Sequence, residues 1–385
     1  MGGVSMEWKE YQIQDVCRLI NGRAYSNDEM LEHGKYKIVR VGNLSGGNST
    51  WFYSDLELPE DKYCHNGDLL FAWACTFGPH IWKEDNTIFH YHIWKIVEDK
   101  DVVDRRFFYY YLKYATGGFL GALNGSVMVH ITKSSMEKMN IRIPKNLEDQ
   151  RRIASILSSL DRKIELNNKI NADLEEMAQA IFKNWFVDFE PFKDGKFVDS
   201  ELGMIPERWK VGTLDEIFSL KYGKNLSTSM ILEKGDYPVY GANGIIGYYN
   251  EFNCDKYSVL VTSRGNGSGD VSRTHHPKSF ITNNSFVVEP LEQYKYIELP
   301  FINGLFNIID FKSYCSGSAQ PQLTNKAMRN ICIISPPMEI VIKYCEMLET
   351  LFSHIECVIA ENSRLSLLRD TLLPRLMSGE LEVPE

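Results

Sequence analysis

Side chains that can hydrogen-bond to the edges of DNA bases lie in several glycine-containing turns of this sequence. In the first half of the chain they are Arg23, Arg40 and Asn43. In the second half they are Lys224, Asn225, Asn243, Arg264, Asn266, Arg273, Gln320 and Gln322, with Ser318 in a run of small residues where a phosphate could approach. Arg and Lys match guanine, and Asn and Gln match adenine, in the major groove. If the ligand is DNA, these residues are the candidates for contacting its bases; the alternative for each of them is contact with a phosphate or only with water.

Strings that resemble enzyme motifs are incomplete. Ser335-Pro336-Pro337-Met338 approaches the Pro-Pro-aromatic tetrad of amino-methyltransferases, but Met replaces the aromatic residue that stacks on a flipped base, so the string predicts a helix start. Gly265–Gly269 follows a strand without a helix behind it, which favours a hairpin turn over a nucleotide-binding loop. Glu190 lacks the second carboxylate that a metal-dependent nuclease requires. We therefore predict no catalytic residue.

Metal ligands are equally incomplete. His90-Tyr91-His92 could hold a metal ion if a third ligand converged, but the adjoining Ile93 and Trp94 favour packing on a strand. The eight cysteines show no metal-ligand spacing and predict reduced, structural thiols. No metal site is predicted.

The composition is that of a folded protein with an acidic excess. The formal net charge at pH 7 is −9, and 44% of the residues are hydrophobic. The acidic residues concentrate in 146–206 and 336–385, and the remaining segments are close to neutral. Binding to DNA would therefore need positive charge from partner proteins as well.

The longest nearly uncharged apolar stretch, Leu69–Gly78, is too short to cross a bilayer, and the N-terminus lacks the pattern of a secretion signal. We expect a cytoplasmic location.

The chain repeats itself once, loosely, at an offset of about two hundred residues. Trp8 returns as Trp209, and Gly22-Arg23 returns as Gly223-Lys224, both at a step of 201 residues. A step of 192 relates Gly125-Ser126 and Ile131-Thr132 to Gly317-Ser318 and Leu323-Thr324. Short apolar runs predict strands at 36–41, 68–73, 92–96, 257–262 and 285–288, and a helix at 104–114. The repeat therefore predicts two similar mixed α/β domains.

Two segments of about 40 residues have helical periodicity, which corresponds to a length of roughly 60 Å each. A seam of residues spaced as in a heptad repeat consists of Leu157, Leu160, Ile164, Asn171, Leu174 and Ile181 in the first segment, and of Leu348, Leu351, Ile355, Asn362, Leu365 and Leu372 in the second. The matched length and phase predict an antiparallel coiled coil, whose polar Asn171 and Asn362 could fix the register. The alternative is that each helix packs only on its own globular domain.

The predicted fold class is α+β: two mixed α/β domains in pseudo-two-fold tandem, separated by two long antiparallel coiled-coil helices. The predicted segments are a first domain at 1–145, a central helix at 146–187, a linker at 188–206, a second domain at 207–335, a C-terminal helix at 336–379 and a tail at 380–385.

Four strings in a fixed order resemble a known family. They are Asn184-Trp185-Phe186-Val187-Asp188-Phe189, Leu202-Gly203-Met204-Ile205-Pro206-Glu207-Arg208-Trp209, Gly317-Ser318-Ala319-Gln320-Pro321-Gln322-Leu323 and Leu372-Leu373-Pro374-Arg375-Leu376-Met377-Ser378-Gly379-Glu380. Within the tandem architecture they make essentially the whole chain resemble the specificity subunit of type I restriction-modification enzymes.

The resemblance implies a non-catalytic DNA-binding subunit of a multisubunit complex. Each globular part would be a target recognition domain for one half of a bipartite site in double-stranded DNA, and the helices would set the gap between the halves. Two methyltransferase subunits would dock on the helices, and a restriction subunit with translocase and nuclease activity would join them. S-adenosylmethionine, ATP and Mg would be bound by those partners, and no cofactor by this chain.

One departure from the family pattern affects the site residues. The Gln-Pro element occurs only in the second half, and the corresponding first-half string is Gly125–His130. Ser126 and His130 are the candidate DNA-binding residues there. The two domains are therefore expected to read different sequences.

Two other functions remain open at this point. A self-contained DNA methyltransferase would need a cofactor-binding βαβ region and an intact tetrad. A coiled-coil scaffold that never touches DNA would need only the helices.

Overall fold

The computed structural model describes residues 6–44, 50–74, 77–122, 131–317 and 320–383. The chain forms two compact units, one made of Met1–Glu165 with Ser363–Glu385 and the other of Leu166–Asn362. Each unit therefore contains one globular domain and a portion of both long helices.

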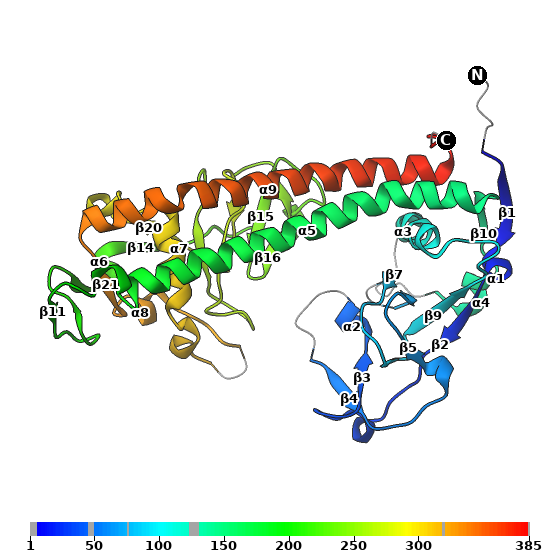
Figure 1. Cartoon of the computed structure of the whole chain (residues 1–385), viewed down its shortest axis with the longest axis horizontal. Coiled ribbons are helices and arrows are strands. Elements are labelled where there is room, and N and C mark those ends of the chain that lie inside the picture. The colour runs from blue at the N-terminus through cyan, green and yellow to red at the C-terminus, as the bar shows by residue number, and fades with distance from the viewer. Residues whose placement is uncertain (1–5, 45–49, 75–76, 123–130, 318–319, 384–385) are drawn as a thin grey trace. The chain divides into compact units, whose positions relative to one another are not determined.

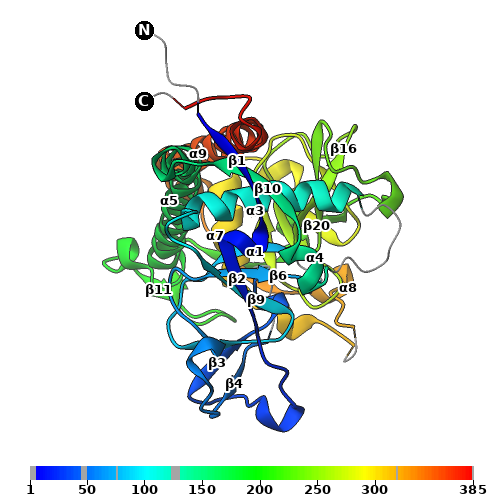
Figure 2. The ribbon, with the colours of Figure 1, turned by 90° about the vertical axis from the view of Figure 1, so that its right-hand side faces the viewer.

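In the first unit, two four-stranded sheets pack together. One has the order β2-β9-β6-β7, with bounds Cys17–Asn21, Ile93–Glu98, Leu69–Ala72 and Gly78–Ile81. The other has the order β4-β3-β8-β5, with bounds Phe52–Ser54, Tyr36–Val39, Thr87–Phe89 and Tyr63–Cys64. Buried Val39 and Phe89 of one sheet pack with Leu70 and Ile93 of the other. A separate antiparallel pair joins β1 (Trp8–Gln12) to β10 (Asn140–Pro144), which ties the start of the domain to its end (Figures 1 and 2).

The helices of this domain are α1 (Ile13–Val16), α2 (Val41–Leu44), α3 (Arg105–Ala122) and α4 (Lys133–Glu137). Helix α3 begins where the Asp104 carboxylate accepts hydrogen bonds from the amides of Arg106 and Phe107, at 3.0 and 3.1 Å. Helix α4 begins where the Thr132 hydroxyl accepts from the Ser135 amide at 3.2 Å.

The second unit repeats this plan. Its four-stranded sheet has the order β14-β20-β17-β18, with bounds Phe218–Tyr222, Ser285–Pro290, Val259–Thr262 and Val271–Arg273. Its three-stranded sheet has the order β16-β15-β19, with bounds Gly244–Tyr249, Tyr237–Gly241 and Phe280–Ile281. The remaining pairs are β13 (Lys210–Thr213) with β21 (Cys332–Ser335) and β11 (Phe197–Val198) with β12 (Ile205–Pro206). Its short helices are α6 (Leu214–Ile217), α7 (Leu299–Ile308) and α8 (Asn325–Met328).

Short 3₁₀ turns complete both units, at Asn27–Glu29, Glu60–Lys62, Glu190–Phe192, Thr228–Met230, Glu292–Tyr294 and Phe311–Tyr314.

The two domains have the same strand connections, which explains the repeat in the sequence. Each contains one parallel strand pair, β3 with β8 and β15 with β19. Thr132 caps α4, and Thr324, its predicted counterpart, caps α8 by accepting from the Ala327 amide at 3.2 Å. The predicted strands correspond to β3, β6, β9, β17 and β20, and the helix predicted at 104–114 is α3, which continues to Ala122.

The two long helices are α5 (Leu147–Phe186) and α9 (Met338–Ser378). Acidic residues occupy their first turns and basic residues their last turns, as the helix dipole favours. Gly379 follows α9 with a positive φ of 78°, a conformation that glycine adopts readily at helix ends. The predicted boundaries of 146–187 and 336–379 lie within one or two residues of these ends.

Within each unit, α5 and α9 lie side by side and run antiparallel (Figures 1 and 2). In the first unit, Arg369 of α9 donates to Asp161 of α5 at 2.8 Å. In the second unit, the ring of Phe186 near the end of α5 contacts that of Tyr344 near the start of α9, with centroids 4.9 Å apart. The predicted antiparallel coiled coil is confirmed.

The helices also pack on their own domains, in addition to packing against each other. Leu157 of α5 and Leu376 of α9 belong to the core of the first unit. Phe182 of α5 and Leu348 of α9 belong to the core of the second. Because each helix buries a second face, side chains outside the predicted seam are also fully buried, among them Ile153, Phe186, Phe352 and Met377.

None of the twelve predicted seam residues is exposed, and Leu157, Leu348 and Ile355 are fully buried. A polar contact crosses the seam in the second unit. The Asn167 amide donates to Asn362 at 2.9 Å and to Glu361 at 2.7 Å, while Asn362 donates to Asn168 at 2.8 Å. Asn362 therefore pairs with Asn167 and Asn168 across the helix pair.

Across the described residues, no helix combines the length and the apolar character needed to span a membrane.

Candidate nucleic-acid interface

In the second domain, two distant segments meet beside the turn that joins β17 to β18. Backbone bridges pair Gln322 with both Arg264 and Ser316. The Gly265 amide donates to Pro321 at 3.2 Å, and the Leu323 amide donates to Ser263 at 2.9 Å. The structure thus brings together Arg264 and Gln322, two of the residues that the sequence predicts as candidates for DNA contact.

Lys224 joins the same surface through the turn between β19 and β20. The Lys224 amide donates to Ile281 at 2.9 Å, and the Asn283 amide donates back to Lys224 at 3.0 Å. The Ser263 amide then donates to Asn284 at 2.7 Å. Lys224, Asn283–Asn284, Ser263 and Arg264 therefore follow one another in space, although their order along the chain is different.

Asn243 and Asn266 lie nearby. The hydroxyl of Thr262, at the end of β17, donates to the carbonyl of Ala242 at 3.0 Å, and Asn243 approaches Gly267 of the β17–β18 turn. The predicted side chains that are exposed here are those of Lys224, Asn225, Asn243, Arg264, Asn266 and Gln320, and that of Gln322 is half-buried. Within the described residues, neither Lys224 nor Arg264 forms an ion pair, so both cations are available to a ligand.

The prediction that Arg273 contacts DNA is wrong, because its side chain lies in the protein interior. Only 5% of this residue is exposed. Its guanidinium donates to Glu175 of α5 at 3.1 Å and lies over the ring of Phe352 of α9 at 5.3 Å. Arg273 therefore anchors the sheet of the second domain to both helices.

In the first domain, Arg23 occupies the place that Lys224 has in the second, but it is already paired. Its guanidinium makes two hydrogen bonds to Glu29, at 2.7 and 2.9 Å. These bonds lower the pKa of Glu29 to about 2. A phosphate or base would have to share Arg23 with this carboxylate.

Arg40 and Asn43 form a turn beside the β8–β9 connection. The Arg40 amide donates to the Asn43 side chain at 3.0 Å, and the Arg40 guanidinium lies over the ring of Phe52 at 4.5 Å. Burial lowers the pKa of His90 to about 4, with His92 and Arg40 contributing to the same effect. His90 is therefore neutral at physiological pH.

The residues His90, Tyr91 and His92 pack on one another and on Trp73 through ring contacts. The three residues therefore pack as predicted, but in the turn between β8 and β9 and not on a strand. Among the described residues, no group of three or more His, Cys, Asp or Glu side chains is arranged to hold a metal ion.

Three predicted residues, Ser126, His130 and Ser318, lie outside the described residues.

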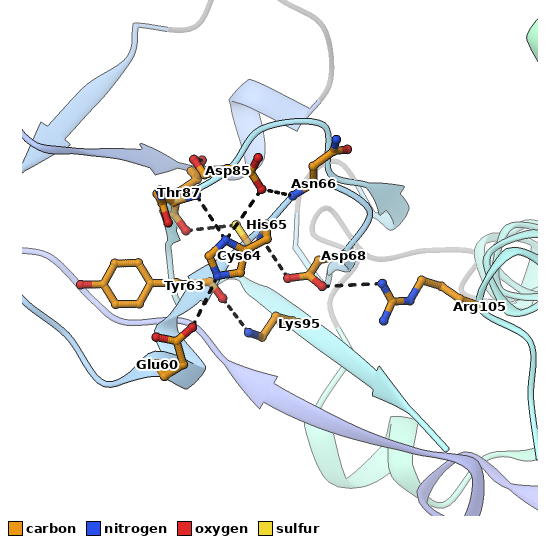
Figure 3. Close-up of polar contacts among 11 residues, drawn as sticks. Glu60, Tyr63, Cys64, His65, Asn66, Asp68, Asp85, Thr87, Lys95 and Arg105 are labelled. Carbon is orange, nitrogen blue, oxygen red and sulfur yellow. Dashed lines mark hydrogen bonds and ion pairs between the residues drawn. The ribbon is translucent and has the colours of Figure 1, made fainter. Parts of the chain in front are cut away.

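A groove of about 1070 Å³ lies between α3 and α5 in the first unit and is rich in positive charge. Several of these cations form ion pairs. Arg105 lies 3.7 Å from Asp68, as Figure 3 shows. Arg105 also pairs with Glu98 at 2.6 Å. In the described chain, no acidic partner pairs with Arg106, Lys113 or Arg162. The groove therefore adds a cationic surface to a domain of nearly neutral net charge.

Figure 3 also shows how the turn before β6 is fixed. The Asp68 carboxylate accepts from the His65 amide at 3.0 Å, and the His65 ring lies between Glu60 and Asp85, at 3.5 and 3.9 Å. The turn holds the start of β6 while Arg105 ties it to α3.

The strings that resemble enzyme motifs have structural roles. Ser335 ends β21 and Met338 begins α9, so the Pro-Pro pair forms a strand-to-helix junction as predicted. Gly265 and Gly269, with φ of 88° and 87°, form the predicted hairpin turn, which is closed by the Gly269 amide donating to Thr262 at 2.9 Å.

Comparisons of the sequence with a family model and with known proteins all match the same protein family. The model of the type I restriction modification DNA specificity domain matches residues 6–176 and again 206–366. The MjaIX specificity subunit of Methanocaldococcus jannaschii is 29% identical over 74% of this chain and 71% of its own length. The HindI specificity subunit of Haemophilus influenzae is 24% identical over 97% of this chain and its own full length.

The fold is also that of a solved relative. The crystal structure of the type I restriction-modification S subunit from M. genitalium superposes with a TM-score of 0.54, at 21% identity, over 96% of both chains. With its specificity domain present twice and matching most of the sequence, the chain belongs to the family of type I restriction-modification specificity subunits.

Proposed function

We propose that each recognition domain reads one half of a bipartite DNA site and that the paired helices set the gap between the halves. The observation that carries this proposal is the repeated domain plan, with polar side chains beside equivalent turns of the two copies, half-buried in the first copy and mostly exposed in the second. Those side chains differ between the copies, which suits a site with two unlike halves. Continuous helices α5 and α9 run from one unit into the other and supply the spacing.

The helices also provide the docking surface for partner subunits in this proposal. Outward-facing apolar side chains on α5 and α9 are exposed, with Leu367 reaching 70%; the others are Leu166, Met177, Met347 and Leu368. Exposed apolar side chains of this kind favour protein contacts. Two methyltransferase subunits would bind here, a restriction subunit would join them, and S-adenosylmethionine, ATP and Mg would be bound by those partners in the cytoplasm.

Docking can be tested with L367S/L368S, which removes apolar surface without touching the core. We expect weaker assembly with the methyltransferase subunits in size-exclusion chromatography, with Ser353→Ala, also exposed on α9, as the control. Assembly at wild-type strength by L367S/L368S would count against this face.

The reading function is tested by mapping methylated adenines in DNA from cells that express the chain with its partners. A single bipartite motif with a fixed gap is expected. Tight, stoichiometric binding of S-adenosylmethionine to the isolated chain would instead favour a self-contained methyltransferase. Failure of the assembled complex to bind any duplex would favour a scaffold.

A further inference from the structure

The turn between β8 and β9 and the turn between β19 and β20 have the same backbone frame. The Tyr91 amide donates to Arg23 at 3.0 Å, as the Asn283 amide donates to Lys224 at 3.0 Å. The Trp73 amide donates to His92 at 3.1 Å, as the Ser263 amide donates to Asn284 at 2.7 Å.

Further hydrogen bonds repeat in the same way on the other side of each turn. The His90 amide donates to Val39, and the Thr282 amide donates to Tyr240, both at 3.0 Å. The glycine before the cation is packed equally closely, because a Cβ atom on Gly22 or Gly223 would overlap the carbonyl oxygens of the turn. Tyr91 and His92 are therefore the structural equivalents of Asn283 and Asn284.

Some equivalent positions of this frame carry similar side chains in the two domains, and others carry side chains of different chemistry. Arg23 and Lys224 are both cations at one place, which fits a feature that all DNA shares, the phosphate backbone. The two residues of the turn differ in every chemical respect, aromatic rings in one copy and amides in the other. Divergent side chains on a common frame are what two domains need to read different bases.

The side chains of these turns are at least partly accessible to a ligand. Tyr91 is 40% exposed, its ring lies 3.9 Å from that of His92, and the Trp73 indole donates to the Tyr91 carbonyl at 2.9 Å. Burial lowers the pKa of His92, so its ring adds aromatic surface rather than positive charge. Asn283 and Asn284 are half-buried, and within the described residues their side-chain amides make no hydrogen bond.

We propose that Tyr91–His92 and Asn283–Asn284 are matched specificity-determining turns, in which the amides of the second domain read adenine and the aromatic surface of the first contacts a thymine methyl group. Asn pairs with the N6 and N7 edge of adenine, and apolar side chains contact the thymine methyl in the major groove. The inference rests on the proposed function of the two domains in DNA reading.

The test uses the chain assembled with its methyltransferase partners and a map of the methylated sites. N283D/N284D keeps the shape of both side chains but replaces the amide donors with acceptors. We expect adenine preference at the contacted position of one half-site to fall roughly tenfold or more, with the other half-site and the gap unchanged. Asn330→Asp, an exposed asparagine of the same domain, is the matched control.

The first domain is tested with Tyr91→Ala and Tyr91→Phe. Loss of the ring should relax preference only in the half-site of the first domain, whereas the Phe variant should keep it. An unchanged motif in N283D/N284D, or equal motifs for Tyr91→Ala and wild type, would overturn the inference. Absence of any bipartite motif for the wild-type complex would instead refute the reading function itself.

Discussion

Two arginines of the second domain, Arg264 and Arg273, differ in burial and therefore in role. Arg264→Ala should change the free energy of unfolding by less than about 0.5 kcal/mol, because the side chain is exposed and forms no ion pair among the described residues. It should weaken base preference in one half-site only. Arg273→Ala should lower the free energy of unfolding by about 2 kcal/mol, because it removes a buried cation from Glu175 and Phe352.

Denaturant unfolding and a methylation map measure the two effects separately. If Arg264→Ala destabilised the protein as much as Arg273→Ala, or if Arg273→Ala alone changed the motif at full stability, these roles would be reversed.

The Arg23–Glu29 pair makes a pH-dependent contribution to the first domain. The folded pKa of Glu29 is about 2, below its ordinary value of 4.5, so its stabilising effect is complete above pH 4.5 and is lost as the pH falls toward 2. Glu29→Gln should remove this dependence. Unfolding curves of the wild type and the variant should therefore converge as the pH is lowered from 5 to about 2, and a constant difference between them would contradict the assignment.

The same substitution should affect DNA binding, since it frees the Arg23 guanidinium. We expect tighter binding of the assembled complex to all sequences and a salt dependence that is steeper by about one unit in the log–log slope. Titrations of fluorescent duplexes at several salt concentrations measure this slope, and Glu32→Gln, another acidic residue of this domain, is the control. An unchanged slope would mean that Arg23 does not reach a phosphate.

For individual residues, the sequence predicted which residue types could contact DNA better than it predicted where their side chains lie in the fold. Arg264 and Gln322 could be proposed because their turns contain glycine and small residues. Arg273 stands in an equally polar turn, and nothing local reveals that Glu175 and Phe352, far away in the sequence, enclose it. Asn283 and Asn284 were missed because they resemble Tyr91 and His92 in no side-chain property, although the step of 192 residues that relates Gly125 to Gly317 also relates these two pairs.

Among the elements, a polar contact joins Asn167 of α5 to Asn362 of α9, and we expect it to select the register of the two helices. Asn167 is fully buried, and its side-chain oxygen lacks a hydrogen-bond partner within the described residues, which is unfavourable for stability. N167L/N362L should raise the thermal midpoint yet allow more than one register. Melting curves and the spread of gap lengths in the methylation map test this, with Asn184→Ala, an exposed asparagine of α5 outside this contact, as control. A lower midpoint with a single gap would show that the contact stabilises the pair without selecting its register.

The long helices were the most predictable elements, because a seam repeated over many turns leaves a strong pattern and proline or glycine marks their ends. Their second buried face was not predicted. Side chains such as Phe182 and Phe352 are buried against the globular domains, a contact that no heptad pattern describes. Helix α3 extends beyond its predicted end at residue 114 because the polar and small residues there do not stop a helix already formed.

At the scale of the whole molecule, the proposed spacing role makes a quantitative prediction. Inserting four residues into α5 and four into α9 lengthens each helix by about 6 Å. The unspecified gap should then grow by one or two base pairs, since base pairs are stacked about 3.4 Å apart. Methylation mapping of the variant complex measures the gap.

The control is a four-residue insertion in the linker at 188–206, which leaves both helices intact and should leave the gap as it was. The spacing role would be refuted if the length of the gap stayed the same after the helix insertions, or if it changed after the linker insertion.

The closely packed glycines at 22 and 223 have a consequence for how such proteins diversify. Because the same main-chain hydrogen bonds hold this turn with Tyr91 and His92 in one copy and with Asn283 and Asn284 in the other, its backbone does not depend on which side chains stand at its tip. They can be exchanged by single codon changes while the architecture stays the same. New target sequences are therefore within reach of small genetic steps, one half-site at a time.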